Sequence, residues 1–191
     1  LTAVQPMKPG VRHLTVDRSN PVPLPPFIGQ RYVEEIDPAL FLPLINTQAL
    51  FRGRWGYRRG KMGADEYREL VHGTVQPIYQ ELLHRSTAEG WLQARVSYGY
   101  FSCHAEENTV IVKADGQEYP FPFPRQAEPP HLCIADYFKS AGEGGDIAGF
   151  FIVTIGARIG EETARLYRDN AYHDYLMLHG FSVEATDALA E

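Results

Sequence analysis

Apolar residues recur at helical spacing soon after residue 35. Ile36, Leu40, Phe41, Leu44 and Ile45 predict one or two short helical turns over 36–45. A further helix is predicted over 49–57, with two large aromatic side chains on one face. We therefore expect a compact helical entry to the domain rather than one long helix.

A longer amphipathic helix is predicted next. Asp65 is expected to cap it, and its apolar stripe continues to about His84. Pro77 lies inside this stretch and has no N–H to donate, so it should kink or divide the helix.

From residue 94 the apolar period changes to two, which indicates strands. We predict strands over 94–102, 109–113 and 118–123, with residues 114–117 (Ala-Asp-Gly-Gln) as the turn of a hairpin. A short element is expected at 131–134. The continuous apolar run IAGFFIVTI, residues 147–155, is typical of a central strand that is buried on both faces.

The pattern of the C-terminal part predicts helices again. One helix is predicted from Glu161 to about Leu178, a break at His179-Gly180, and a last helix capped by Ser182. Helices therefore flank a mostly antiparallel sheet, and the predicted fold class is α+β.

Residues 1–30 are rich in proline and predict an interdomain linker that precedes one domain over 31–191. Proline favours extended backbone and cannot donate a hydrogen bond to a sheet interior. The alternative is an arm that packs on its own domain.

Composition and charge exclude some classes of protein. The net charge of −6 argues against a general nucleic-acid binder, and no apolar run reaches the roughly 18–20 residues that cross a membrane.

The cysteines, Cys103 and Cys133, are too few for a disulfide scaffold, so we expect a cytoplasmic location. With His104 and His131 they could supply metal ligands, but the spacing is poor for zinc and buried free thiols are the favoured interpretation.

One segment stands out by its chemistry. Residues 51–61 (FRGRWGYRRGK) interleave arginine and lysine with aromatic side chains and contain no acid. Such a pattern is typical of single-stranded nucleic-acid binding, of a solvated helix end with a buried tryptophan, or of a contact with an anionic partner domain. Because the whole chain is acidic, the solvated helix end is favoured.

Several segments in order resemble the activation domain of cobalamin-dependent methionine synthase. The similar segments are the proline-rich approach SNPVPLPPFIGQRYVEEID, then LPLINTQALFRGRWGYRRG at 42–60, YGYFSC at 98–103, FPFPRQ at 121–126, HLCIADYF at 131–138 and YHDYLMLHGFSVEATDALAE at 172–191. Each motif is modest alone, and together they are collinear over most of the chain.

The resemblance implies a C-shaped α+β domain with a bent, mostly antiparallel sheet flanked by helices. It also implies a reactivation module of a methyltransferase of methionine biosynthesis. The module would bind S-adenosylmethionine for the reductive methylation of cob(II)alamin to methylcobalamin. The partners implied are the corrinoid-binding domain of the same enzyme, which holds the cobalamin, and a flavodoxin-type or other reductase.

Two cofactor-binding residues carry over by resemblance, and no catalytic or metal-ligating residue does. Asn46 aligns with a family aspartate that holds the α-ammonium group of the cofactor, and Asp187 falls on the helix where the family has another acid. A carboxylate binds an ammonium by a charge-assisted hydrogen bond, whereas an amide oxygen offers only a neutral one. A helix cap is the alternative role for Asn46, and a surface acid is the alternative for Asp187.

The family's Arg-Pro-Ala-Pro-Gly-Tyr-Pro loop would follow this last helix, and the sequence ends before it. The resemblance therefore implies that the C-terminal part of the domain is missing and that the fragment alone is inactive. By chemistry alone, Tyr98, Tyr100, Tyr175 and His179 are the residues expected to face a corrinoid. The rival function is a non-catalytic docking module that covers a corrinoid domain or binds a reductase.

Overall fold

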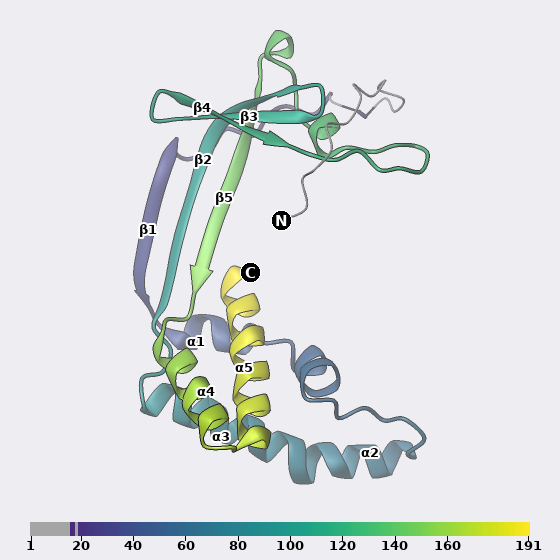
Figure 1. The fold of residues 1–191 in the computed structure, drawn as a ribbon, viewed down its shortest axis with the longest axis vertical. Coiled ribbons are helices and arrows are strands. Elements are labelled where there is room, and N and C mark those ends of the chain that lie inside the picture. The colour runs from purple at the N-terminus through teal and green to yellow at the C-terminus, as the bar shows by residue number, and fades with distance from the viewer. Residues whose placement is uncertain (1–15, 18) are drawn as a thin grey trace. The chain divides into compact units, whose positions relative to one another are not determined.

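The computed structural model describes residues 16, 17 and 19–191, and it confirms the α+β class (Figure 1). The strands are β1 (Gly29–Ile36), β2 (Ala94–Glu106), β3 (Thr109–Ala114), β4 (Gln117–Pro122) and β5 (Asp146–Thr154). The helices are α1 (Pro38–Phe41), α2 (Ala64–Leu70), α3 (Gln76–Ala88), α4 (Arg158–Arg168) and α5 (Tyr172–Ala190). Shorter helical segments are η1 (Leu42–Leu44), η2 (Ala49–Arg54), η3 (Val71–Val75), η4 (Ile134–Tyr137) and η5 (Ala141–Glu143).

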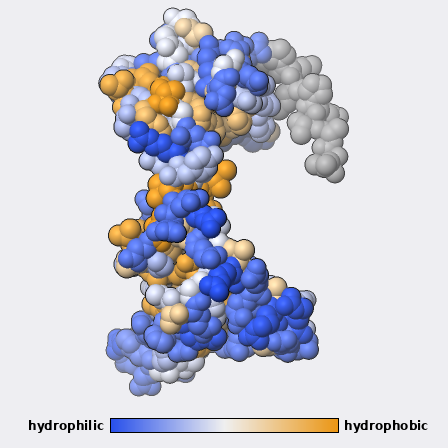
Figure 2. Space-filling view, turned by 90° about the vertical axis from the view of Figure 1, so that its left-hand side faces the viewer, coloured by the Kyte–Doolittle hydropathy of each residue, from blue (hydrophilic) through white to orange (hydrophobic). Residues whose placement is uncertain are grey.

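The chain forms two compact units, each with its own hydrophobic cluster. Unit 1 comprises Leu1–Arg31 and Tyr98–Phe151, and unit 2 comprises Tyr32–Ser97 and Ile152–Glu191. The buried cluster of unit 1 is small and is built around Val110 and Val112, whereas unit 2 holds the larger, mainly helical cluster. On the face shown in Figure 2, the helical part of the chain is mostly hydrophilic, as expected for amphipathic helices.

Part of the predicted linker packs against the rest of unit 1. The carbonyl of Asn20 accepts a hydrogen bond from Lys139 Nζ at 3.1 Å. The ring of Phe27 lies edge-on to Tyr98 and Tyr100, and the guanidinium of Arg31 lies 3.9 Å from its centre. Residues 1–15 lie outside the described residues, and a linking role for 1–30 stays a prediction.

The sheet has five strands in the order β1-β2-β3-β4, and β5 also pairs with β2. The predicted hairpin is confirmed: β3 and β4 are antiparallel, with Ala114 opposite Gln117. Asp115 and Gly116 between them both have positive φ, +51° and +73°, as the tightest hairpin turn requires. β2 is also antiparallel to β3 and extends beyond the predicted strand to Glu106.

The prediction of a fully buried strand at 147–155 is wrong. Within β5 only Ala148 is buried, while Phe151 and Ile152 are 59% and 74% exposed. Among the described strands, β5 pairs with β2 alone. An unbroken apolar run specifies strand formation but not what covers each face, because covering depends on distant parts of the chain.

Pro77 disturbs the first long helix without ending it, since residues 64–88 are helical throughout. α2 continues into the wider π-helical turn η3, and α3 follows with Pro77 in its first turn. Proline has no N–H to donate and its ring crowds the carbonyl one turn earlier, which accounts for the widened turn directly before it. The cap is different from the prediction: Gly63 precedes α2, its N–H donates to Glu66 at 3.3 Å, and Asp65 lies in the first turn.

The entry segments are also confirmed. Asp37 caps α1 by accepting a hydrogen bond from the Ala39 N–H at 2.9 Å, and η1 follows. In η2 and directly after it, Phe51 and Trp55 stack with their ring centres 5.4 Å apart.

The predicted break at His179-Gly180 is wrong, since α5 runs unbroken through it. The chain turns instead at Asn170, whose φ is +59°. A Cβ built on Gly180 would lie 2.9 Å from Trp55, so this glycine permits close packing rather than ending a helix. Ser182 is likewise inside α5 and donates its hydroxyl hydrogen bond to the His179 carbonyl.

Candidate functional site

Asn46 lies in unit 2 between η1 and η2, and both of these segments contact α5. Its side chain is exposed, and its Oδ1 accepts a hydrogen bond from the Ala49 N–H at 3.0 Å. Asn46 therefore caps the helical turn at residues 47–48 that leads into η2, which is the alternative role considered above. The second lone pair of Oδ1 leaves room for a ligand donor, so a cofactor contact stays a prediction.

Asp187 lies near the end of α5, and its side chain is 65% exposed. Among the described residues, only Arg54 lies within ion-pair distance of Asp187, with Nη2 3.5 Å from Asp187 Oδ2. The same guanidinium binds Glu184, one turn earlier, through Nε at 2.9 Å. The hydrogen bond to Glu184 raises the pKa of Arg54, so the guanidinium stays charged.

Sequence reasoning missed Glu184 and Arg54 as members of this cluster. Glu184 is 5% exposed and lies on the side of α5 that also carries Gly180 and Ala188. An acidic residue that shares one face of a helix with buried small residues indicates a buried ion pair, since charged side chains are rarely buried unpaired. Its partner comes from a segment 130 residues away, which no local pattern reveals.

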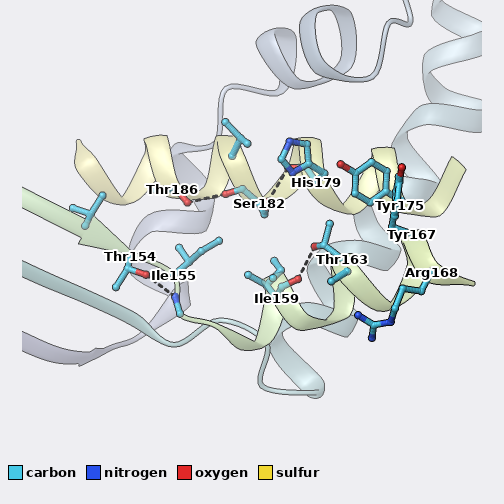
Figure 3. A pocket seen from close by; sticks show the side chains of 15 residues that line it. Thr154, Ile155, Ile159, Thr163, Tyr167, Arg168, Tyr175, His179, Ser182 and Thr186 are labelled. Carbon is cyan, nitrogen blue, oxygen red and sulfur yellow. Dashed lines mark hydrogen bonds between the residues drawn. The ribbon is translucent and has the colours of Figure 1, made fainter. Parts of the chain in front are cut away.

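A groove of about 830 Å³ runs beside α5 within unit 2, between the end of β5, α4 and α5 (Figure 3). Ile159, Thr163 and Tyr167 line it from α4, and Tyr175, His179 and Thr186 line it from α5. On a helix, residues 175, 179, 182 and 186 share one side, and Asp187 lies about 100° further round. The groove and the Asp187 cluster are therefore adjacent sides of one helix.

Aromatic rings dominate one end of the groove. Tyr175 and His179 stack with ring planes only 2° apart, and Tyr167 lies edge-on to Tyr175 with centres 5.2 Å apart. The hydroxyls of Thr163, Ser182 and Thr186 donate to carbonyls of their own helices (Figure 3). The rings are thus the groups that the groove offers to a planar ligand or partner.

The four residues expected to face a corrinoid are divided between the two units. Tyr175 and His179 line this groove. Tyr98 and Tyr100 belong to unit 1 and contact Phe27.

The interpretation of the cysteines as buried free thiols is confirmed. Cys103 and Cys133 are both free and buried, and burial raises the pKa of Cys103 to about 11. In the described part of the chain, no three His, Cys, Asp or Glu side chains lie in a group that could hold a metal ion. None of the helices among residues 16–17 and 19–191 combines the length and the apolar character needed to cross a bilayer.

Known proteins are similar to this chain in sequence and in fold. Residues 63–191 match the family described as "Vitamin B12 dependent methionine synthase, activation domain". Methionine synthase of Mycobacterium tuberculosis is 39% identical over 183 residues, and that of Mycobacterium leprae is 38% identical over 182 residues. Each match covers 89% of this chain, and the chain spans about 15% of the length of these relatives.

A solved structure, that of the MetH reactivation domain bound to AdoHcy, has the same fold. It superposes with a TM-score of 0.75 at 18% sequence identity, over 93% of this chain and 57% of that one.

Proposed function

Since this chain belongs to the family of vitamin B12-dependent methionine synthase activation domains, we propose that it is a reactivation module that binds S-adenosylmethionine. The methyl acceptor is cobalamin held by a neighbouring corrinoid domain, and the electron comes from a reductase. When bound, the cofactor supplies a methyl group on a sulfonium leaving group, so this chain has mainly to position it. We further propose that the module works in the cytoplasm.

The cluster on α5 is the observation that carries this proposal. Asp187 presents a mostly exposed carboxylate on α5, and Asn46 lies between η1 and η2, the two segments of unit 2 that contact this helix. A carboxylate and an amide oxygen are the acceptors that an α-ammonium group needs. Two carboxylates and one guanidinium leave the cluster of Arg54, Glu184 and Asp187 with one net negative charge, which favours a cationic ligand.

We assign the groove beside α5 to the corrinoid domain. Its stacked Tyr175 and His179 and the neighbouring Tyr167 present rings at one end of the groove, and Thr186, which precedes Asp187 in α5, lines the other end. Flat rings pack against a macrocycle or against aromatic side chains of a partner. Because groove and cluster are adjacent sides of one helix, a partner in the groove lies close to a ligand at Asp187.

We assign the reductase to the basic segment, residues 51–61. Arg58 donates to the Arg52 carbonyl and Arg59 to the Met62 carbonyl, so these guanidinium groups are oriented by the backbone, and no described carboxylate forms an ion pair with them. A positive segment on an acidic chain attracts an acidic electron-transfer protein and steers its approach.

The cofactor role is tested by Asp187→Ala in a full-length methionine synthase that carries this chain. S-adenosylmethionine is titrated by calorimetry, and reductive methylation is followed by the corrinoid absorption spectrum. We expect binding weaker by roughly 1–3 kcal/mol, the usual loss for a charge-assisted hydrogen bond. Asp174→Ala, also an exposed acid of α5, is the matched control and should leave binding unchanged.

The second candidate function is a docking module without a cofactor site of its own. The intramolecular bonds of Asn46 and Asp187 favour it, since each side chain already has a partner. It predicts equal cofactor binding by Asp187→Ala and wild type. That result, in a wild type that binds the cofactor, would remove Asp187 from the site and favour docking.

A further inference from the structure

Arg54 joins two carboxylates that differ sharply in burial. Its Nε binds the buried Glu184 at 2.9 Å, and its Nη2 lies 3.5 Å from the exposed Asp187. Only the guanidinium has donors fixed in a planar fork that reaches two acceptors at once. Arg54 therefore connects the carboxylate of Glu184, which is shielded from solvent, with the carboxylate of Asp187, which is open to a ligand.

The backbone around Arg54 is itself held against α5. The indole of Trp55 donates to the Met177 carbonyl at 2.9 Å, and its ring lies against Gly180. A Cβ on Gly180 would also come within 3.0 Å of the Arg54 Cβ. The packing of Trp55 against α5 thus fixes the backbone position of Arg54. This position determines how closely the guanidinium approaches Asp187.

We propose that Arg54 is a positioning residue, which uses Glu184 as an anchor and holds the Asp187 carboxylate in the orientation that binds the cofactor's ammonium group. The proposal rests on the proposed function and adds to it a residue that acts through Asp187. An exposed aspartate that is free to rotate loses rotamer freedom when a ligand binds, and a preset orientation removes that cost. Arg54 contacts Oδ2, and Oδ1 stays available to a ligand donor.

Two variants separate this role from simple support of the fold. Arg54→Met with Glu184→Gln removes both charges of the buried pair, so no unpaired carboxylate is left inside. Arg54→Lys keeps a cation beside Glu184 but lacks the fork that reaches Asp187. Arg68→Met is the control, because Arg68 is an exposed arginine whose ion pair with Asp65 is local to α2.

Cofactor affinity is measured by calorimetry in the full-length enzyme, and melting temperature is measured in parallel. Both Arg54 variants should bind S-adenosylmethionine about tenfold more weakly, and Arg68→Met should bind as wild type does. Adding Asp187→Ala to the double variant should weaken binding less than the same change does in wild type, because the orientation is already lost. If the double variant does not fold, Arg54→Lys and its combination with Asp187→Ala give the same comparison.

Wild-type affinity in a folded Arg54 variant overturns the proposal. So does a full Asp187→Ala loss in the Arg54 background, since Arg54 would then act independently of Asp187. Failure of the proposed function has a different signature: wild type itself does not bind the cofactor, and the positioning role then falls with it.

Discussion

At the residue scale, Gly180 shows how one absent side chain sets the distance between two segments. It lies inside α5, where glycine is ordinarily unfavourable compared with alanine. Trp55 occupies the space that a Cβ would need, and this tryptophan is only 8% exposed. The contact keeps Arg54, the residue before Trp55, close to the acids of α5.

Gly180→Ala is therefore expected to destabilise the protein in spite of its better helix propensity. The gain from propensity is about 1 kcal/mol, whereas forced overpacking against an aromatic ring costs about 1–3 kcal/mol. We expect a net loss of about 1 kcal/mol in the free energy of unfolding, measured by urea denaturation. Gly73→Ala is the matched control, because its Cβ would meet open space and it should be neutral or stabilising. A stabilised Gly180→Ala would contradict the packing role.

At the element scale, the segment from η2 to the start of α2 combines a buried side with a charged one. Phe51 and Trp55 are buried in the cluster of unit 2. The basic side chains of the same segment bind polar groups outside that cluster. The Arg52 Nε donates to the Tyr67 hydroxyl at 3.2 Å, and Arg59 donates to a backbone carbonyl. The aromatic side chains thus anchor a cationic surface on the helical unit.

Neutralising part of this surface should slow reduction by an acidic flavodoxin-type protein. Arg59→Gln with Lys61→Gln removes two exposed charges, and we expect the association rate at low salt to fall by about tenfold. The difference from wild type should shrink as ionic strength rises, because salt screens exposed charges. Stopped-flow reduction at several salt concentrations measures both effects. Lys113→Gln, an exposed lysine of β3, is the control, and equal rates for all three proteins at every salt concentration would rule out docking here.

At the scale of the whole molecule, each unit has its own internal support. In unit 1, Arg125 forms two hydrogen bonds with Asp136, at 2.7 and 2.8 Å, and both side chains are buried. Arg125 also donates to Asn108 and to the His131 carbonyl, so one side chain ties together several loops. Unit 2 depends instead on the apolar cluster of its helices.

Arg125→Met should destabilise unit 1 selectively. It leaves the Asp136 carboxylate buried without its cationic partner, which costs about 3–5 kcal/mol. Hydrogen exchange followed by mass spectrometry should show faster exchange over residues 98–151 and little change over α5. Gly180→Ala should give the reverse pattern. Equal acceleration in both units would show that they unfold as one.

Local patterns in the sequence predicted much of the fold but only part of the candidate site. The hairpin turn at 114–117, the strands beside it and a disturbance of the helix at Pro77 were all predicted, because turn chemistry and proline act on their own neighbours. Asn46 and Asp187 came from resemblance, and their role in binding stays a prediction. The groove residues Tyr175 and His179 were singled out by chemistry alone.

The sequence by itself determined the elements whose cause lies within a few residues: the capping of α1 by Asp37, the positive-φ turn at Asp115 and Gly116, and the alternation of the strands. Only the tertiary structure decided that Gly180 serves packing, that Glu184 is buried against Arg54, and that β5 leaves Phe151 and Ile152 exposed. The physical reason is distance along the chain. A backbone conformation responds to its neighbours, whereas burial and ion pairing depend on partners that folding brings from more than a hundred residues away.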